Sequence, residues 1–159
     1  SGAMNAAYFL ARQTKLGSTI YYEDLMANFI FPYKVPIGIL QRYWNKYINR
    51  LPEERILNAI DIDYVMRIIK YKKFLDIKKI KEQNIKFYVK LLNLKNGNIE
   101  YVNAKTGNIL KILKAAICIA PYVFSYVKIN DKKYIDGTIK DPIGLSIYSI
   151  NIPIIRLLL

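Results

Sequence analysis

Residues 134–144 form the stretch YIDGTIKDPIG, in which a carboxylate, Asp136, stands between an apolar pair and a glycine. Just upstream, residues 126–129 and 133–135 flank Asn130 and Asp131, residue types that favour tight turns. The pattern predicts a short hairpin that places Asp136 at the end of its second strand. From local sequence, Asp136 is either a turn residue or an acid positioned for catalysis.

Length and composition indicate one globular domain, since the chain has 159 residues of which 53% are hydrophobic. The net charge of +13 would suit a polyanionic partner such as nucleic acid or an anionic membrane. The lysines are spread along the chain, however, and accompany many Ile, Asn and Tyr residues. A general bias in composition therefore explains the charge better than a dedicated basic patch.

Two residue types narrow the chemistry. The chain has no histidine, which excludes Ser-His-Asp and Cys-His arrangements and most zinc sites. The single cysteine, Cys118, lies in an apolar run, so we expect a small buried side chain without chemistry of its own. No uncharged stretch is long enough to cross a bilayer. The sequence leaves the compartment open and favours the cytoplasm only slightly.

The first part of the chain predicts helices. Residues 2–11 carry no charge and are rich in small residues, which favours a helix buried on most sides. Residues 21–50 contain Pro32, Pro36 and Gly38 and predict short helices and loops.

Further helices are expected up to residue 83. Pro52 predicts the first turn of a helix with Ile56, Leu57 and Ile60 on one face. Asp61 or Asp63 is expected to cap a helix through Ile69, and Asp76 to cap residues 77–82. We interpret residues 21–83 as a mainly helical cover.

Residues 84–159 carry the strand signals. Apolar residues alternate with polar ones over residues 85–91, and Asn96-Gly97 predicts a type I′ hairpin turn before residues 99–102. Residues 106–108 then open a helix whose buried face is expected to hold Ile109, Ile112, Leu113, Ala116 and Ile117, with Pro121 ending it. This order of elements predicts an α/β fold with a sheet at its centre.

The C-terminal half combines a buried helix and proline-containing loop (ILKAAICIAPYV), a short hairpin (YVKIN and DKKYI), an Asp-Gly motif (DGT) and a following proline (DPIG). In this order these parts resemble the patatin-like phospholipase family. The start, SGAMNAAYFLARQ, is similar to the residues that follow the nucleophile in the family's Gly-x-Ser-x-Gly motif. The resemblance implies a single patatin-like domain fragment over residues 1–159, an incomplete three-layer α/β/α sandwich.

The resemblance also implies a function, that of a lipid acyl hydrolase with a Ser-Asp dyad and no cofactor or metal. Asp136 would be the catalytic carboxylate, Gly137 would allow a tight turn beside it, and Gly2 would let the helix pack against a strand. Thr138 stands where the family has Gly or Ala, so its branched side chain is expected to crowd the site. The implied partners are a phospholipid or other acyl-ester lipid substrate and, peripherally, an anionic membrane.

The nucleophile is expected immediately upstream of Ser1, so the chain would be truncated at its N-terminus and inactive alone. A second truncation is expected at the C-terminus. Ser1 is alternatively a tag residue, or the nucleophile itself in a shifted register. The second alternative is disfavoured because Ala3 stands where the motif needs glycine.

Other carboxylates and a rival function complete the expectations. Capping is favoured over a metal pair for Asp61 and Asp63, and Asp131 and Asp141 are expected in turns. The rival function is a basic, aromatic-rich module that binds nucleic acid or an anionic membrane, supported by 14 tyrosines and the lysine excess. Nucleic acid is the less favoured partner because no nucleic-acid-binding motif is present.

Overall fold

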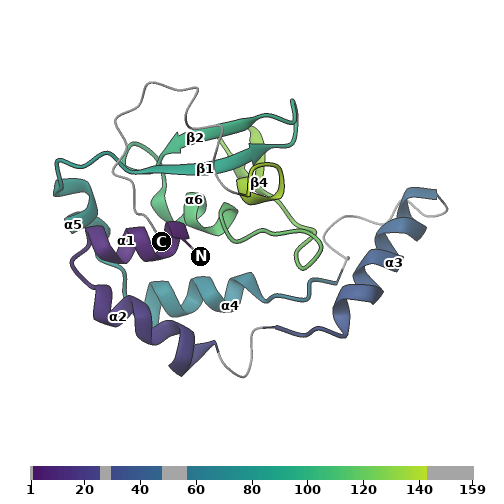
Figure 1. Ribbon diagram of the computed structural model, residues 1–159, viewed down its shortest axis with the longest axis horizontal. Helices are drawn as coiled ribbons and strands as arrows, with labels where there is room; N and C mark the ends of the chain where they lie inside the picture. Colours follow the sequence, from purple (N-terminus) through teal and green to yellow (C-terminus); the bar gives the residue numbers. More distant parts are fainter. Residues whose placement is uncertain (1, 26–29, 48–56, 143–159) are drawn as a thin grey trace.

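The protein is a mixed α/β chain in a computed structural model that describes residues 2–25, 30–47 and 57–142 (Figure 1). Most helices of the described chain precede the first strand, and one lies between the second and third strands. In chain order the elements are α1 (Gly2–Leu10), α2 (Thr14–Thr19), the π-helical turn η1 (Ile20–Asp24), α3 (Lys34–Tyr47), α4 (Ile62–Arg67), the π-helical turn η3 (Ile68–Lys72), α5 (Ile77–Glu82), β1 (Tyr88–Asn93), β2 (Ile99–Asn103), α6 (Ile109–Ala115), β3 (Val127–Ile129), β4 (Lys132–Asp136) and the 3-10 turn η4 (Gly137–Ile139).

The strands form one antiparallel sheet in the order β2-β1-β4-β3. Each outer pair is a local hairpin, β1–β2 and β3–β4, so both hairpins predicted from the sequence are confirmed. The pairing of β1 with β4 joins the two hairpins and sets Leu91 opposite Asp136. This pairing brings the Asp-Gly motif to the centre of the sheet.

The turns of the two hairpins differ from the prediction. Among the loop residues after β1, only Gly97 has a positive φ, of 68°, so the predicted type I′ turn at Asn96-Gly97 is wrong. A type I′ turn needs positive φ at both central residues. Asn130 and Asp131 meet this requirement with φ values of 47° and 61°, and the two-residue loop of the second hairpin therefore has the primed geometry.

Helix α6 supplies the core beneath the sheet. The Asn108 side chain caps it by accepting the Lys111 N–H at 3.1 Å, and Ile109, Ile112 and Leu113 are fully buried. The helix contacts β1, β3 and β4 on one side and α4 on another, as Figure 1 shows. The start of the predicted helix and the burial of Ile109, Ile112 and Leu113 are confirmed, but the helix ends at Ala115, well before Pro121, so the proline does not end it.

Helix α1 is buried over most of its circumference. Met4, Ala7, Tyr8 and Leu10 lie in the core, and the other alanines of the helix pack against it, whereas Asn5 and Phe9 face solvent. The expectation of burial on most sides is confirmed, with one narrow exposed strip that contains Phe9.

Side-chain caps confirm two predicted helix starts. Asp61 accepts the Tyr64 N–H at 2.8 Å at the start of α4, and Asp76 accepts the Lys79 N–H at 3.1 Å at the start of α5. Each carboxylate satisfies an N–H that the helix itself leaves without a partner.

The helix predicted from Pro52 lies outside the described residues as far as Ile56, and it is absent from residues 57–60. The Ala59 N–H donates to Tyr122 O at 2.7 Å, and Ala59 O accepts the Phe31 N–H at 2.7 Å. These backbone bonds to distant segments replace the bonds that a helix would need.

The α/β class is confirmed, and Figure 1 places the α-helices on the α6 side of the sheet. The described residues reveal no helical layer on the opposite face. In the same view α3 extends away from the sheet and α6.

The turn geometry yields a stability prediction. Replacing Asp131 by glycine should raise the free energy of unfolding by about 0.5 kcal/mol, because glycine adopts a φ of 61° without the steric cost. Asn96→Gly is the matched control and should lower the free energy of unfolding by about 0.5–1 kcal/mol. Asn96 has no positive φ that glycine would relieve, and its side chain accepts the Asn98 N–H at 3.0 Å, a hydrogen bond that glycine would lose. Urea unfolding measures both, and a shift of equal sign in the two variants would contradict the assignment.

Candidate active site

Asp136 lies at the end of β4 in a buried position, with 5% of its surface exposed. Its backbone N–H donates to Cys118 O at 3.0 Å, which connects the strand to the segment that follows α6. Strand pairing with Leu91 holds it from the other side. The main-chain position of the carboxylate is therefore defined by two elements outside its own hairpin.

The two carboxylate oxygens of Asp136 have different surroundings. Oδ1 accepts the Thr138 N–H at 2.8 Å and the Thr138 hydroxyl at 2.7 Å, so it caps η4. Within the described residues we find no hydrogen bond to Oδ2. Asp136 is thus a turn-capping residue through one oxygen, while the other oxygen is not used by the turn.

Thr138 does not crowd the carboxylate as the sequence suggested. Its side chain is largely exposed, and its hydroxyl donates to Asp136. A glycine or alanine there would lack this hydrogen bond.

Gly137 is required by close packing. A Cβ at this position would lie 2.8 Å from Lys90 Cγ and 3.0 Å from both the carbonyl carbon and the oxygen of Lys90. The Lys90 side chain is itself fixed, because its ammonium group lies 3.6 Å from the Asp141 carboxylate. The tight turn expected at Gly137 therefore rests on the approach of β1 and not on an unusual φ.

Gly2 has a different environment from the one expected. It is the exposed first residue of α1, and a Cβ there would meet nothing within 4 Å. The close packing of Gly2 against a strand is not found among the described residues. Helix α1 mainly contacts α2 and α5, whereas β4 contacts β1, β3 and α6, so the two halves of the motif have different neighbours. Figure 1 shows the amino end of α1 directed toward the middle of the molecule.

Cys118 is fully buried, as predicted, and its Sγ donates to Lys114 O at 3.3 Å. Burial raises the pKa of the thiol to about 11, and the negative charge of Asp136 contributes to the increase. The hydroxyl of Ser125 is also buried, and within the described part of the chain it has no hydrogen-bond partner. A protonated thiol at neutral pH is a packing group and not a nucleophile.

Each of the other candidate carboxylates has a separate local environment. Asp63 forms an ion pair with Lys114 at 2.6 Å, Asp131 lies in the exposed hairpin turn, and Asp61 caps α4. Among the described residues, no three His, Cys, Asp or Glu side chains are grouped so that they could hold a metal ion.

Asp24 is a buried charge that the sequence analysis missed. Its side chain is fully buried, Oδ1 lies 2.5 Å from Lys72 Nζ, and Oδ2 has no hydrogen-bond partner among the described residues. The hydrogen bond to Asp24 raises the pKa of Lys72. Only the fold reveals this pair, because the two residues are far apart in sequence and neither lies in a motif.

Comparisons of the chain with protein-family models, curated proteins and solved structures found no match. In the described part of the chain, no helix combines the length and the apolar character needed to span a bilayer. The arguments for function therefore come from the residues and the geometry of this chain.

The contact at Gly137 predicts a sharp effect of one methyl group. Gly137→Ala should lower the free energy of unfolding by about 1–3 kcal/mol, since the backbone of Lys90 must move to admit the Cβ. Gly2→Ala, at a position with open space, is the control and should be neutral or stabilising by up to about 1 kcal/mol. Equal losses in the two variants, measured by chemical denaturation, would rule out the packing argument.

Three buried acidic groups predict loss of stability in alkali. Burial raises the pKa values of Tyr8, Tyr134 and Cys118, and Tyr134 also donates a hydrogen bond to Glu100. Above pH 9 the unfolded chain releases protons from these groups while the folded chain retains them. Because the folded state then binds more protons, the free energy of unfolding should fall as pH rises from 9 to 11.

Urea midpoints measured between pH 7 and pH 11 test this expectation. The slope should approach about 1.4 kcal/mol per pH unit for each group that ionises only on unfolding. Tyr134→Phe should make the decline shallower, and a midpoint independent of pH in the original chain would show that the three groups titrate normally.

Proposed function

We propose that this chain forms the greater part of a patatin-like lipid acyl hydrolase, in which Asp136 acts as the general base of a Ser-Asp dyad. The observation that carries the proposal is the geometry of Asp136, a carboxylate that is buried at the end of a strand. Its Oδ1 accepts two hydrogen bonds from Thr138, whereas the turn does not use its Oδ2. A base that is already fixed by a hydrogen bond is oriented for proton transfer.

The proposed reaction needs a serine that approaches Oδ2, because Oδ1 is occupied by two hydrogen bonds from Thr138. The serine is expected at the amino end of α1, directly before Ser1, where the helix dipole favours developing negative charge. The serine oxygen would attack the ester carbonyl as its proton passes to Asp136. Loss of the alcohol leaves an acyl-enzyme, which water hydrolyses.

The proposed substrates are fatty-acyl esters such as phospholipids, and the reaction uses no metal or cofactor. Oxyanion donors are expected from a glycine-rich loop upstream of this chain, so the chain by itself is expected to be inactive. Gly137 would contribute by keeping β1 and the turn in close contact, which fixes the backbone next to the base.

The rival proposal is a basic, aromatic-rich module that binds nucleic acid or an anionic membrane, and its nucleic-acid form has less support. Several lysines that would have to contact phosphates are paired with carboxylates on neighbouring elements, as in Lys72 with Asp24 and Lys114 with Asp63. Lys132 is likewise paired with Glu100 at 3.2 Å. These ion pairs reduce the positive charge available at any one place on the described surface.

Esterase activity of the chain extended upstream to restore Gly-x-Ser and the glycine-rich loop tests the hydrolase proposal. On a p-nitrophenyl ester and on a phospholipid, Asp136→Asn should lower kcat/KM by about 10²–10⁴-fold while the unfolding midpoint changes little, since asparagine retains the Oδ1 acceptor. Asp131→Asn, in an exposed turn, should leave the rate unchanged.

The dependence on ionic strength distinguishes ester hydrolysis from the binding of phosphate groups. Hydrolysis of a neutral ester should be nearly independent of salt, whereas phosphate binding should weaken steeply as salt is added. A folded but inert extended protein, or one indifferent to Asp136→Asn, would overturn the proposed dyad.

A further inference from the structure

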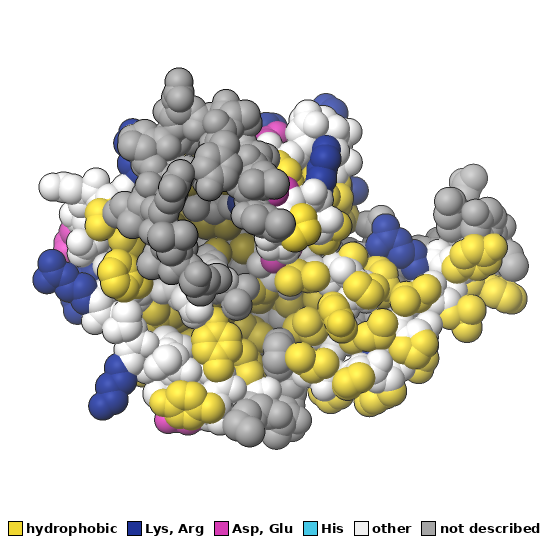
Figure 2. Space-filling view, in the orientation of Figure 1, with side chains coloured by type: hydrophobic (Ala, Val, Ile, Leu, Met, Phe, Trp, Pro, Cys, Tyr) yellow, Lys and Arg dark blue, Asp and Glu magenta, His cyan; other side chains and the backbone are white. Residues whose placement is uncertain are grey.

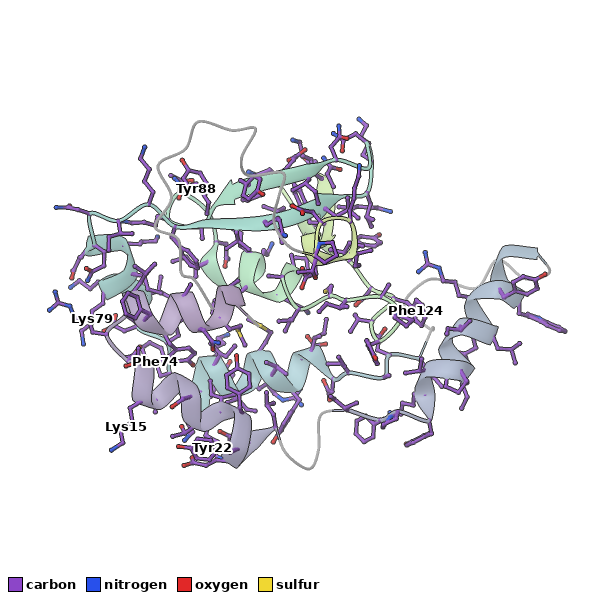
Figure 3. All side chains as sticks on the ribbon, viewed as in Figure 1. Lys15, Tyr22, Phe74, Lys79, Tyr88 and Phe124 are labelled. Atoms are coloured by element: carbon purple, nitrogen blue, oxygen red, sulfur yellow. The ribbon has the colours of Figure 1, made fainter. Side chains whose placement is uncertain are left out.

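Helix α3 is attached to the rest of the protein through its polar side. Gly38 is buried there, and a Cβ on it would lie 2.6 Å from Leu57 O and 2.7 Å from Phe124 Cε2. Gln41 Oε1 accepts the Leu57 N–H at 3.0 Å, and the Arg42 guanidinium lies 5.4 Å from the centroid of the Phe124 ring. Figure 3 shows Phe124 in the loop that faces α3.

The opposite side of α3 is apolar and exposed. Ile37, Leu40, Tyr43 and Trp44, which we call the outward face, are 42%, 66%, 65% and 51% exposed. At 100° per residue these four side chains span about 120° of the helix surface, on the side opposite Gly38 and Arg42. Figure 2 shows apolar side chains gathered over the segment that leads into α3 and over α3 itself.

An exposed apolar surface of this kind requires an explanation, because apolar area in contact with water costs about 25 cal/mol per Å². Contiguous patches on soluble proteins usually mark surfaces that bind another molecule. The residue types here are specific, since Trp and Tyr beside Leu and Ile are the residues that favour the boundary between water and lipid.

The charge distribution selects the partner. Helix α3 contains Lys34, Arg42 and Lys46 and no acidic residue, and the whole chain carries +13. A second copy of the chain would bring the same positive charge to the contact, so electrostatics disfavour self-association. A bilayer with anionic headgroups offers the opposite charge together with an apolar interior.

We propose that the outward face of α3 docks this protein on the surface of an anionic phospholipid bilayer. The helix, about 21 Å long, would lie in the plane of the interface with Leu40 and Trp44 below the headgroups. The inference goes beyond the proposed hydrolysis and does not depend on it, because docking is measured without any ester cleavage.

Trp44 is the only tryptophan in the chain, so its fluorescence reports on α3 directly. We would titrate the 159-residue chain with vesicles of phosphatidylcholine containing about 30 mol% phosphatidylserine. Docking predicts a blue shift of the Trp44 emission and protection from acrylamide. Vesicles of phosphatidylcholine alone, or added salt, should weaken the binding several-fold because the electrostatic attraction is lost or screened.

Leu40→Glu tests the face while keeping the fluorophore, and it should weaken vesicle binding about tenfold or more. Phe74→Glu is the matched control, since Phe74 is 61% exposed and lies at the other end of the molecule from α3 (Figure 3). Both positions are on the surface, so both variants are expected to fold, which the unfolding midpoint verifies.

Four outcomes would overturn the inference. The first is no shift with anionic vesicles, and the second is equal loss of binding in Leu40→Glu and Phe74→Glu. The third is a concentration-dependent blue shift without lipid, which would assign the face to a second copy. The fourth is a shift with a single-stranded oligonucleotide but not with vesicles, which would assign the face to nucleic acid.

Discussion

The pairing of β1 with β4 is the contact on which the rest of the described fold depends. Each hairpin is a local structure, and an isolated two-stranded hairpin is marginal in water. Three residue pairs, Leu91 with Asp136, Leu92 with Ile135 and Asn93 with Tyr134, convert the two hairpins into one sheet. Helix α6 links β2 to β3 and must therefore cross the sheet, which places its buried face against three of the four strands.

This pairing also explains why glycine follows Asp136. The chain turns into η4 directly beside β1, and the backbone of Lys90 leaves no room for a side chain on Gly137. This lack of space is enough to explain why glycine follows Asp136, without any catalytic role for the dipeptide. Capping of η4 by Asp136 Oδ1 is a second structural reason for the same dipeptide. The catalytic proposal therefore rests on the other carboxylate oxygen and on burial, not on the presence of the motif.

Local features of the fold could be predicted from the sequence where neighbouring residues determine them. Asp76 caps α5 by accepting a hydrogen bond from the nearby backbone N–H of Lys79. The spacing of the apolar residues in α6 likewise identifies the buried face of that helix from the local sequence. The helix predicted over residues 57–60 failed because its backbone groups bond to Tyr122 and Phe31, which lie far away in the chain. No local pattern contains that information.

Helix α3 shows a different limit of sequence analysis. Pro36 and Gly38 suggested interrupted structure, yet Pro36 falls in the first turn, where its missing N–H has no helical partner to lose. Gly38 is needed for the approach of Leu57 and Phe124 and not for a break. A helix interior tolerates one glycine when tertiary packing offsets its cost of about 1 kcal/mol.

In the candidate site, the sequence located Asp136 and Gly137 correctly at the end of a hairpin strand, because both the turn and the strand are local. It could not show that Oδ1 and Oδ2 differ, since that difference depends on the two hydrogen bonds that Thr138 donates to Oδ1. The ion pair of buried Asp24 with exposed Lys72 was equally invisible, because burial of Asp24 follows from the packing of distant segments.

The two amphipathic helices α6 and α3 are oriented in opposite ways. Helix α6 buries Ile109, Ile112 and Leu113, as an ordinary core helix does. Helix α3 buries Gly38 and turns Leu40 and Trp44 outward, so its contact with the protein includes a hydrogen bond and an Arg–Phe stack but little of its apolar area. Water is a poor solvent for the outward face, whereas the edge of a bilayer accepts it at no such cost. An apolar surrounding outside the protein would therefore complete the burial that the intramolecular packing of α3 leaves unfinished.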